Sequence, residues 1–464
     1  MKSLKRKQHI LVVAYAFPPC QESGSIRNAK LLTNLLNNSC EITILTVKER
    51  YFSFNVESTM KKLIPEDIHI IRTNYFSLHD FIVNLKNIFT TLYNLNTKGK
   101  QIELSKVRNS NEFLNIPNSK FTKVKDIITD LVTIPDNEVG WLPFGLFAGI
   151  TELFRKEVDV IYAIGKPWSG FFIGYGLKLI FKKPLVIDFM DPWTQNPYKQ
   201  SKCKMLEKLQ TFLEKFIVKR ADFLIANTQE LADDFVKRLK TSPEKVGVIT
   251  CGYDENDFNY DNIKERKNKQ FVISHIGSLY SGRNPFNFLM AIKHLIDNKF
   301  ISQDVIRINL IGNLTIQEPE LLMLIQELSL SGVLFTQSWV PHSDAIKYLY
   351  QSDVLLLIQP GTHLQIPAKL YEYIFVKKPI IPIADKNSAI DNIFRREGWG
   401  ISINNNIKDI TDAVFKVYCQ FQSGKLNNYI HKENIQPYNV KHLAKKLCHI
   451  FELVINNQAK KNKI

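Results

Sequence analysis

A lysine and a glutamate lie one helical turn apart in the stretch IPAKLYEYIFVKKP, residues 366–379. Pro367 suits the first turn of a helix, and Lys369 and Glu372 follow it. On a solvated helix face, such an i,i+3 pair is an ordinary ion pair. At a helix N-terminus that faces a ligand, however, the ammonium would bind an anion together with backbone N–H groups. The carboxylate would then accept hydrogen bonds from the two hydroxyls of a ribose.

A glycine turn followed by an arginine occurs in HIGSLYSGRNPF, residues 275–286. A strand is expected to end there, Gly277 and Ser278 to turn the chain, and Arg283 to lie just before the next helix. The planar guanidinium matches phosphate oxygens, although an isolated arginine is often only a solvated surface residue. Because Arg283 and Lys369 indicate the same anionic ligand, we predict that they bind the diphosphate of a nucleotide without a metal ion.

The first loop of the chain has a similar form, in AYAFPPCQESGSIRNAK, residues 14–30. Gly24 and Ser25 stand between an apolar strand and a helix, and Arg27 lies in the first turn of that helix. The loop is neither a Walker loop nor a GxGxxG turn, so its signal is weak alone. Two interpretations stay open: a loop that binds acceptor or phosphate, and a structural turn with a serine N-cap.

Acidic and aromatic residues follow two further apolar segments. Asp188, Asp191 and Trp193 occur in VIDFMDPWTQNPY, and Asp136 and Trp141 occur in TIPDNEVGWLPF. Carboxylates accept hydrogen bonds from sugar hydroxyls, and indole faces pack on sugar C–H groups. The alternative is local turn structure, since an aspartate before a proline commonly starts a turn.

These motifs need elements that bring strand ends together. Short apolar, β-branched runs alternate with segments of helical period, which predicts an α/β protein with parallel sheets. A polar segment around residues 257–269 indicates a linker. We therefore predict two doubly wound, Rossmann-like domains, 1–265 and 266–439, with residues 440–464 forming a helix that packs back toward the N-terminal domain. Ligands of such sheets bind outside the carboxyl ends of the strands, so two facing domains would form an interdomain cleft.

The expected strands of the first domain are 9–15, 41–47, 68–72, 158–164, 184–189, 222–227 and 246–250, and those of the second are 271–276, 305–311, 332–336, 353–358, 378–383 and 399–403. Helices are expected at 25–36, 285–297, 318–331, 342–351, 367–376 and 440–457. The polar, Asn- and Lys-rich region 76–137 is expected to form helical insertions and loops.

Composition narrows the class of protein. The chain has 464 residues, 45% hydrophobic and 23% charged, as in a globular protein of two or three domains. Its net charge of +16 favours anionic partners, but no nucleic-acid-binding motif is present, so nucleic acid is not expected among them. Six dispersed cysteines indicate a reducing cytoplasm and no zinc site. The apolar start lacks a signal-peptide cleavage site, and no apolar run reaches the ~18 residues of a spanning helix.

The order of these motifs resembles the family-4 retaining glycosyltransferases of the GT-B fold, which assemble bacterial polysaccharides and lipid-linked glycans. The likeness runs over nearly the whole chain, from YAFPP and GSIR through DFMDPW and HIGSLYSGR to IPAKLYEY. It implies transfer of a hexose-type sugar from a nucleoside diphosphate sugar to a glycan or lipid-linked acceptor, with retention of configuration and with no metal or other cofactor. The protein's part would be orientation and electrostatic stabilisation of the leaving diphosphate.

The resemblance also implies a role for each candidate residue. Arg283 and Lys369 would be catalytic, as the basic pair on the diphosphate. The donor-binding residues would be Gly277, Ser278, Ile366, Pro367 and Glu372, the acceptor and phosphate loop Gly24, Ser25 and Arg27, and the acceptor side Asp136, Trp141, Asp188, Asp191 and Trp193.

Two departures from the family pattern leave alternatives open. Leu364 stands where many members carry the first of two glutamates, and Met190 stands where close relatives carry an arginine. A non-catalytic scaffold that binds a nucleotide sugar would tolerate both changes. A nucleotide-sugar epimerase is a second alternative, because it shares the architecture.

A basic amphipathic segment extends from Lys199 to Arg220. Such a helix can lie at an anionic membrane surface, which would place the protein in the cytoplasm and peripherally at the inner face of the cell membrane. A helix of the outer layer of the sheet, with a solvated basic face, would give the same pattern.

Overall fold

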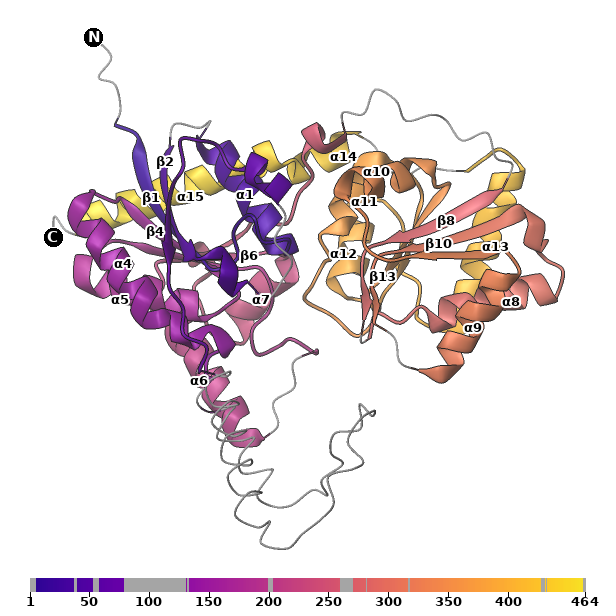
Figure 1. The fold of residues 1–464 in the computed structure, drawn as a ribbon, viewed down its shortest axis with the longest axis horizontal. Coiled ribbons are helices and arrows are strands. Elements are labelled where there is room, and N and C mark those ends of the chain that lie inside the picture. Colours follow the sequence, from indigo (N-terminus) through magenta and orange to yellow (C-terminus); the bar gives the residue numbers. More distant parts are fainter. Residues whose placement is uncertain are drawn as a thin grey trace, which may run out of the picture.

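The computed structural model describes residues 6–36, 40–52, 58–78, 131, 133–198, 203–258, 270–280, 282–315, 318–426, 430 and 432–461. Two α/β domains lie side by side, each with a parallel sheet between layers of helices (Figure 1). The expected boundary at residue 265 and most of the region 76–137 lie outside the described residues.

Seven parallel strands form the N-terminal sheet, in the order β3-β2-β1-β4-β5-β6-β7. Its central strands are apolar and buried, as expected for a parallel sheet covered on both faces. The strands are β1 (Gln8–Ala14), β2 (Cys40–Val47), β3 (His69–Thr73), β4 (Val160–Gly165), β5 (Leu185–Phe189), β6 (Phe223–Ala226) and β7 (Val246–Val248).

Helices cover both faces of this sheet. They are α1 (Ser23–Leu36), α4 (Leu142–Arg155), α5 (Ser169–Phe181), α6 (Lys204–Arg220), α7 (Gln229–Lys237) and, from the end of the chain, α15 (Val440–Lys461). The face with Leu11 and Val13 packs against α4 to α7, and the face with Ile10 and Val12 packs against α1 and α15. The last helix of the described chain thus completes the N-terminal core.

The C-terminal sheet has five parallel strands in the order β12-β10-β8-β13-β14. One face packs against α8, α9 and α13 and the other against α10, α11 and α12. The strands are β8 (Phe271–Ile276), β10 (Ile306–Ile311), β12 (Leu334–Gln337), β13 (Val354–Ile358) and β14 (Ile380–Ile383). The helices are α8 (Phe286–Asp297), α9 (Pro319–Leu330), α10 (His342–Gln351), α11 (Lys369–Val376), α12 (Ala389–Arg396) and α13 (Ile407–Gln422).

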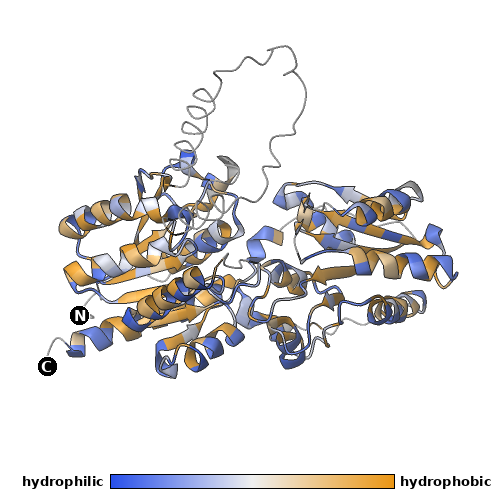
Figure 2. Ribbon diagram, turned by 90° about the horizontal axis from the view of Figure 1, so that it is seen from below, coloured by the Kyte–Doolittle hydropathy of each residue, from blue (hydrophilic) through white to orange (hydrophobic). Residues whose placement is uncertain are grey.

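The predicted fold class is confirmed, and all predicted strands but one are observed, with ends within two residues of the predicted ones. The short parallel pair β9 (Leu279–Tyr280) and β11 (Leu314–Thr315) was not predicted. The strand predicted at 399–403 is wrong, because that segment makes only an isolated bridge between Ile403 and Ile383. Gly400 has a φ of 122°, which is outside the extended region and interrupts the ladder. Apolar strands lie between helices whose outer faces are polar, as the hydropathy colouring shows (Figure 2).

Each sheet reverses its strand order once, between β1 and β4 and between β8 and β13. Ligands of open α/β sheets bind at the carboxyl ends of the strands beside such a switch point. Loops from these two edges meet: Thr228, after β6, donates to the carbonyl of Leu364, after β13, at 2.8 Å. The fold therefore brings the two expected ligand-binding edges together at the domain junction.

Candidate active site

Two glycine turns lie at the carboxyl edge of the C-terminal sheet. Gly277 follows β8 with a φ of 122°, and Gly312 follows β10 with a φ of 130°. A Cβ on Gly312 would overlap the backbone of Gly277, and a Cβ on Gly277 would overlap the side chain of Lys369. Glycine is needed at both positions, and the bare backbone lets Lys369 approach the end of β8.

Lys369 contacts a histidine that the sequence analysis did not single out. Its Nζ lies 2.9 Å from Nε2 of His275 on β8, and Nδ1 of this fully buried ring lies 2.9 Å from the carbonyl oxygen of Leu356 on β13. Burial and the charge of Lys369 lower the pKa of His275 well below its usual value, so the ring is neutral. Nδ1–H then donates to Leu356, and Nε2 accepts from the ammonium. The signal in the sequence was a histidine beside a serine, Ser274, in an otherwise apolar strand.

The charge on Lys369 is finely balanced. Burial and the neighbouring Arg283 lower the pKa of Lys369 to about 7, and Glu372, one turn along α11, opposes this shift. An anion bound between the two cations would restore the ordinary preference for the charged form. Strongly perturbed pKa values cluster at functional sites.

Arg283 is held between aromatic rings. Its guanidinium carbon lies 4.9 Å from the ring centroid of Tyr280 and 5.9 Å from that of Tyr198. Tyr198 belongs to the loop after β5, so the N-terminal domain contributes a ring to the arginine of the C-terminal domain. Nε of Arg283 is buried and has no hydrogen-bond partner in the part of the chain that the structure describes, which leaves it able to donate to a ligand oxygen.

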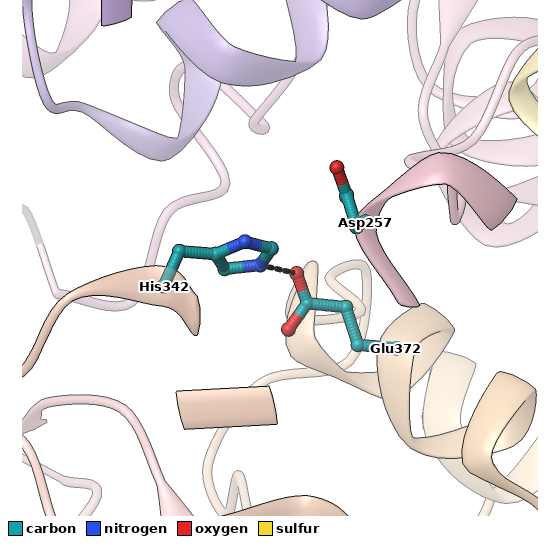
Figure 3. Close-up of side chains that lie close together, drawn as sticks. All are labelled: Asp257, His342 and Glu372. Atoms are coloured by element: carbon teal, nitrogen blue, oxygen red, sulfur yellow. Dashed lines mark hydrogen bonds and ion pairs between the residues drawn. The ribbon is translucent and has the colours of Figure 1, made fainter. Parts of the chain in front are cut away.

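Glu372 is held by a histidine on the neighbouring helix. Its Oε1 lies 2.9 Å from Nε2 of His342, the first residue of α10 (Figure 3). Burial acts to raise the pKa of Glu372, but the hydrogen bond and charge of His342 outweigh it and hold this pKa below its ordinary value. The carboxylate is ionised, and His342 occupies only one of its oxygens, so it retains acceptor capacity for ribose hydroxyls.

The remaining predicted donor residues differ in exposure. Ser278 is exposed directly after Gly277, whereas Ile366 is buried in the core of the domain. Pro367 precedes α11, and its carbonyl accepts from the N–H of Leu370 at 3.0 Å. The structure thus gives Ile366 a packing role, and the polar groups at the turn come from its neighbours.

The first-loop residues of the N-terminal domain lie largely inside the protein. Arg27 donates from Nη1 to Oδ2 of Asp188 at 2.9 Å and from Nη2 to the carbonyl of Ile249 at 2.9 Å. Asp188 has no exposed surface and also accepts from the hydroxyl of Tyr162, and Ser25 is equally buried. Arg27 and Asp188 therefore form a buried ion pair between α1 and β5, in place of the acceptor contacts predicted for them.

Three other predicted acceptor-side residues are structural as well. Trp141 is fully buried, and Trp193, 4% exposed, stacks on Trp168 with ring centroids 5.1 Å apart. Asp136 accepts hydrogen bonds from the backbone N–H and the hydroxyl of Ser169 at 2.8 and 2.6 Å. Side chains so enclosed do not form an acceptor wall in this conformation, because surrounding side chains and backbone occupy the space around them.

Asp191 is the predicted acceptor-side residue that lies at the domain junction. Its side chain is 30% exposed, Oδ1 accepts from Nε2 of Gln365 at 2.7 Å, and Oδ2 lies 3.5 Å from Nζ of Lys166. Glu22 lies close enough to interact with both Asp191 and Lys166. Burial and the charge of Asp191 raise the pKa of Glu22, and the charge of Lys166 opposes this rise. The sequence analysis missed Glu22 and Lys166, which are ordinary loop residues in sequence and are brought together by β1, β4 and β5.

The two departures from the family pattern are apolar contacts at this junction. A Cβ on Gly24 would approach Cε of Met190 to 2.9 Å, so Met190 fills space beside the first loop. Leu364 packs against the core of the N-terminal domain while its carbonyl accepts from Thr228. Neither position supplies a charged group to the site.

A family model and a curated relative match this chain. Residues 117–257 match the model described as Glycosyltransferase Family 4. An Escherichia coli enzyme named UDP-Gal:alpha-D-GlcNAc-diphosphoundecaprenol alpha-1,3-galactosyltransferase is 24% identical over 270 residues, which are 56% of this chain and 67% of the relative.

Solved structures share the fold over nearly the whole chain. Sucrose-phosphate synthase from Thermosynechococcus elongatus has a TM-score of 0.64 at 13% identity, covering 97% of this chain and 100% of that one. The Anabaena protein HepE, solved in complex with UDP-glucose, has a TM-score of 0.59 at 12% identity, covering 96% and 99%. At such identities the likeness establishes the two-domain architecture alone.

Proposed function

We propose that the chain is a GT-B glycosyltransferase of the family-4 type, and that it transfers a hexose-type sugar from a nucleoside diphosphate sugar to a glycan or lipid-linked acceptor, with retention and without a metal ion. One observation carries the proposal. Lys369 lies against the bare backbone of Gly277 at the switch point of the C-terminal sheet, near enough to Arg283 for the two charges to interact, and Glu372 lies one helical turn away.

The two cations would act on the leaving group. As the bond between the sugar and the diphosphate breaks, its electron pair passes to a diphosphate oxygen, and Arg283 and Lys369 stabilise the growing charge. The N-terminal N–H groups of α11 add to this field. His275 orients Lys369 by accepting from its ammonium, so the cation is held before the charge develops.

Retention requires the acceptor to approach the face that the diphosphate leaves. The acceptor hydroxyl oxygen bonds to the anomeric carbon, and its proton passes to the departing diphosphate oxygen. Asp191, which lies at the carboxyl edge of the opposite domain, would accept a hydrogen bond from another acceptor hydroxyl and so hold the acceptor in place.

A lipid-linked acceptor is supported by the named substrate of the Escherichia coli relative, a sugar on diphosphoundecaprenol. Such an acceptor lies at a membrane surface, and no helix in the described part of the chain is long and apolar enough to cross a membrane. In our proposal the acceptor binds to the N-terminal domain, so contact with the membrane would use a surface of that domain.

Adjacent helices α4, α5 and α6 supply such a surface. Phe147 and Phe154 of α4 are 74% and 77% exposed, and Phe212 of α6 is 61% exposed. Exposed cations accompany them on α6: Lys204, Lys208, Lys215, Lys219 and Arg220. Apolar side chains beside a basic face suit an anionic bilayer, so sedimentation with phosphatidylglycerol vesicles should exceed that with phosphatidylcholine vesicles. Equal sedimentation with both would remove the charge-based part of the proposal.

A thermal-shift panel with UDP, GDP, ADP and CMP tests the donor site. A nucleotide at ~100 times its Kd stabilises the protein by about 2.7 kcal/mol, and Lys369→Ala and Glu372→Ala should abolish the shift. A panel in which no nucleotide raises the melting temperature would contradict the proposal.

Turnover separates transfer from the two alternatives. A glycosyltransferase releases nucleoside diphosphate in proportion to the acceptor glycosylated. A scaffold binds the nucleotide sugar without turnover, and an epimerase changes the donor sugar without any acceptor. Chromatography of the nucleotide products with and without acceptor distinguishes the three.

A further inference from the structure

A chain of four alternating charges links the two domains beside the proposed ribose carboxylate. Lys30 of α1 is ion-paired with Asp257, in the short helix η5 (Glu255–Phe258). The ligand atoms of Asp257, His342 and Glu372 lie within 4.8 Å of one another, and Nε2 of His342 lies 2.9 Å from Oε1 of Glu372 (Figure 3). The order is therefore cation, anion, imidazole, anion.

Each member is carried by a different element. Phe258 packs against Phe375 of α11 with ring centroids 4.2 Å apart, so Asp257 is fixed to the helix that bears Glu372. Lys30 instead belongs to the helix that covers the N-terminal sheet. The Lys30–Asp257 pair is partly buried, with side chains 13% and 15% exposed, so it is shielded from solvent more than a surface pair.

The charges around His342 favour its protonated form. Burial acts to lower the pKa of His342, but the hydrogen bond and charge of Glu372 and the charge of Asp257 outweigh burial and raise it, while Lys30 opposes. An imidazolium donates to Glu372 and is drawn toward Asp257, which restricts the rotamers of the glutamate. The side chain of Glu372 remains 27% exposed.

We propose that His342 is a positioning residue for donor binding: it orients Glu372 toward the ribose, and Asp257 and Lys30 extend this control to the N-terminal domain. The inference rests on the proposed function, because it takes Glu372 as the ribose acceptor. It adds a residue outside the motifs that predicted the site.

The same three side chains are also a set that could hold a divalent cation. The structure favours the ion-pair chain, because the ammonium of Lys30 already neutralises Asp257 and the imidazole of His342 is already bonded to Glu372. A metal ion would have to displace the ammonium of Lys30 from Asp257 and remove the proton that His342 donates to Glu372. Donor binding should therefore be unchanged by EDTA, and loss of binding in EDTA would overturn the proposal.

The expected size of the effect follows from side-chain ordering. Fixing one rotamer-rich side chain on binding changes affinity by about three- to tenfold. His342→Ala should raise the donor Kd by about this factor and change kcat little, because His342 does not touch the reacting atoms. His449→Gln, a change at a 78% exposed histidine on α15, is the matched control and should have no effect.

The pH dependence separates positioning from structural support. His342→Gln keeps a hydrogen-bond donor but cannot titrate. The ratio of its donor Kd to that of wild type should be largest below the raised pKa of His342 and fall toward one as pH rises through it. A ratio that is constant with pH would mean that His342 only supports the fold.

Substitution of Asp257 and of Lys30 should shift the titration midpoint of His342 in opposite directions. Asp257→Asn removes a charge that raises the pKa of His342, so the midpoint should shift to lower pH; Lys30→Met removes a charge that lowers it, so the midpoint should shift to higher pH. NMR titration of the His342 ring, assigned with His342→Gln, measures both shifts. Shifts in the same direction, or none, would exclude the chain of charges.

Glu372→Ala distinguishes failure of this inference from failure of the proposed function. If Glu372→Ala leaves nucleotide binding unchanged, the proposed donor site is wrong. If Glu372→Ala weakens binding while the His342 variants do not, the donor site stands and the positioning role is overturned.

Discussion

The two switch points use polar residues in opposite ways. In the C-terminal sheet, Arg283 and Lys369 lie together at the strand ends, and their charges disfavour one another. In the N-terminal sheet, Arg27 and Asp188 neutralise one another inside the core. Similar motifs in sequence thus give a charged site in one domain and a structural ion pair in the other. In our proposal, the charged site binds the phosphates of the donor.

The largest expected effect tests the structural side of this comparison. Arg27→Met should lower the free energy of unfolding by about 3–5 kcal/mol, because it leaves the buried carboxylate of Asp188 without a cation. Urea unfolding followed by circular dichroism measures the change. Arg6→Met, which breaks an exposed pair with Glu157, is the control and should change stability by less than about 1 kcal/mol. If Arg27→Met kept the wild-type stability but lost sugar transfer, Arg27 would instead be a residue of the active site.

The next effect tests the catalytic side. Lys369→Ala should lower kcat by about 10² to 10³ because the developing charge on the diphosphate loses one donor. Initial rates of nucleoside diphosphate release measure it at saturating donor. Lys416→Ala, at an exposed lysine on α13, is the matched control and should retain full activity. If the kcat of Lys369→Ala lay within about threefold of the wild-type value, Lys369 would not stabilise the leaving diphosphate, and the contrast between the two switch points would be wrong.

The position of the proposed donor residues at one sheet edge was predictable from the sequence because each of their motifs is local. Gly277 and Lys369 each follow a recognisable strand, and the βα alternation alone indicates that those strand ends share an edge. His275 was missed although it stands in an apolar strand, because a histidine in such a strand is ordinarily a packing residue.

The acceptor half was less predictable because its roles depend on distant pairing. Arg27 and Asp188 are separated by 161 positions, and no spacing rule links an arginine in a first helical turn to an aspartate at the end of the fifth strand. Aromatic residues near strand ends gave the same difficulty. The sequence predicts that the indole rings of Trp141 and Trp193 pack on a sugar, but α4, α5 and the loop after β5 enclose both rings.

The pH dependence of donor binding gives a smaller effect at the same site. The pKa of Lys369 is lowered to about 7, and a bound diphosphate should raise it. Below pH 7 the ammonium is already present; above pH 7 binding must take up a proton, so the donor Kd should rise by up to about tenfold per pH unit. Calorimetry in buffers of different ionisation enthalpy counts the protons. Lys369→Met should lose this uptake; an uptake retained in the variant would place the titrating group elsewhere.

The smallest expected effect concerns the exposed carboxylate at the N-terminal switch point. Asp191→Asn keeps an acceptor for Gln365 but removes the charge that faces Lys166 and, in our proposal, an acceptor hydroxyl. Loss of one such hydrogen bond should raise the acceptor KM by about two- to tenfold. The donor Kd should not change, since Asp191 belongs to the opposite sheet edge, and Asp233→Asn on the exposed face of α7 should alter neither constant.

Steady-state rates measured separately against acceptor and donor resolve the two constants. A rise in both would mean that Asp191 acts through the domain junction, where it contacts Gln365 near α11, instead of through the acceptor. A fall of more than about 10² in kcat at saturating acceptor would be a different result again, because it is the size expected for a group that moves a proton in the reaction. In that case the N-terminal switch point would supply chemistry as well as orientation, and the division of labour between the two sheet edges would no longer hold.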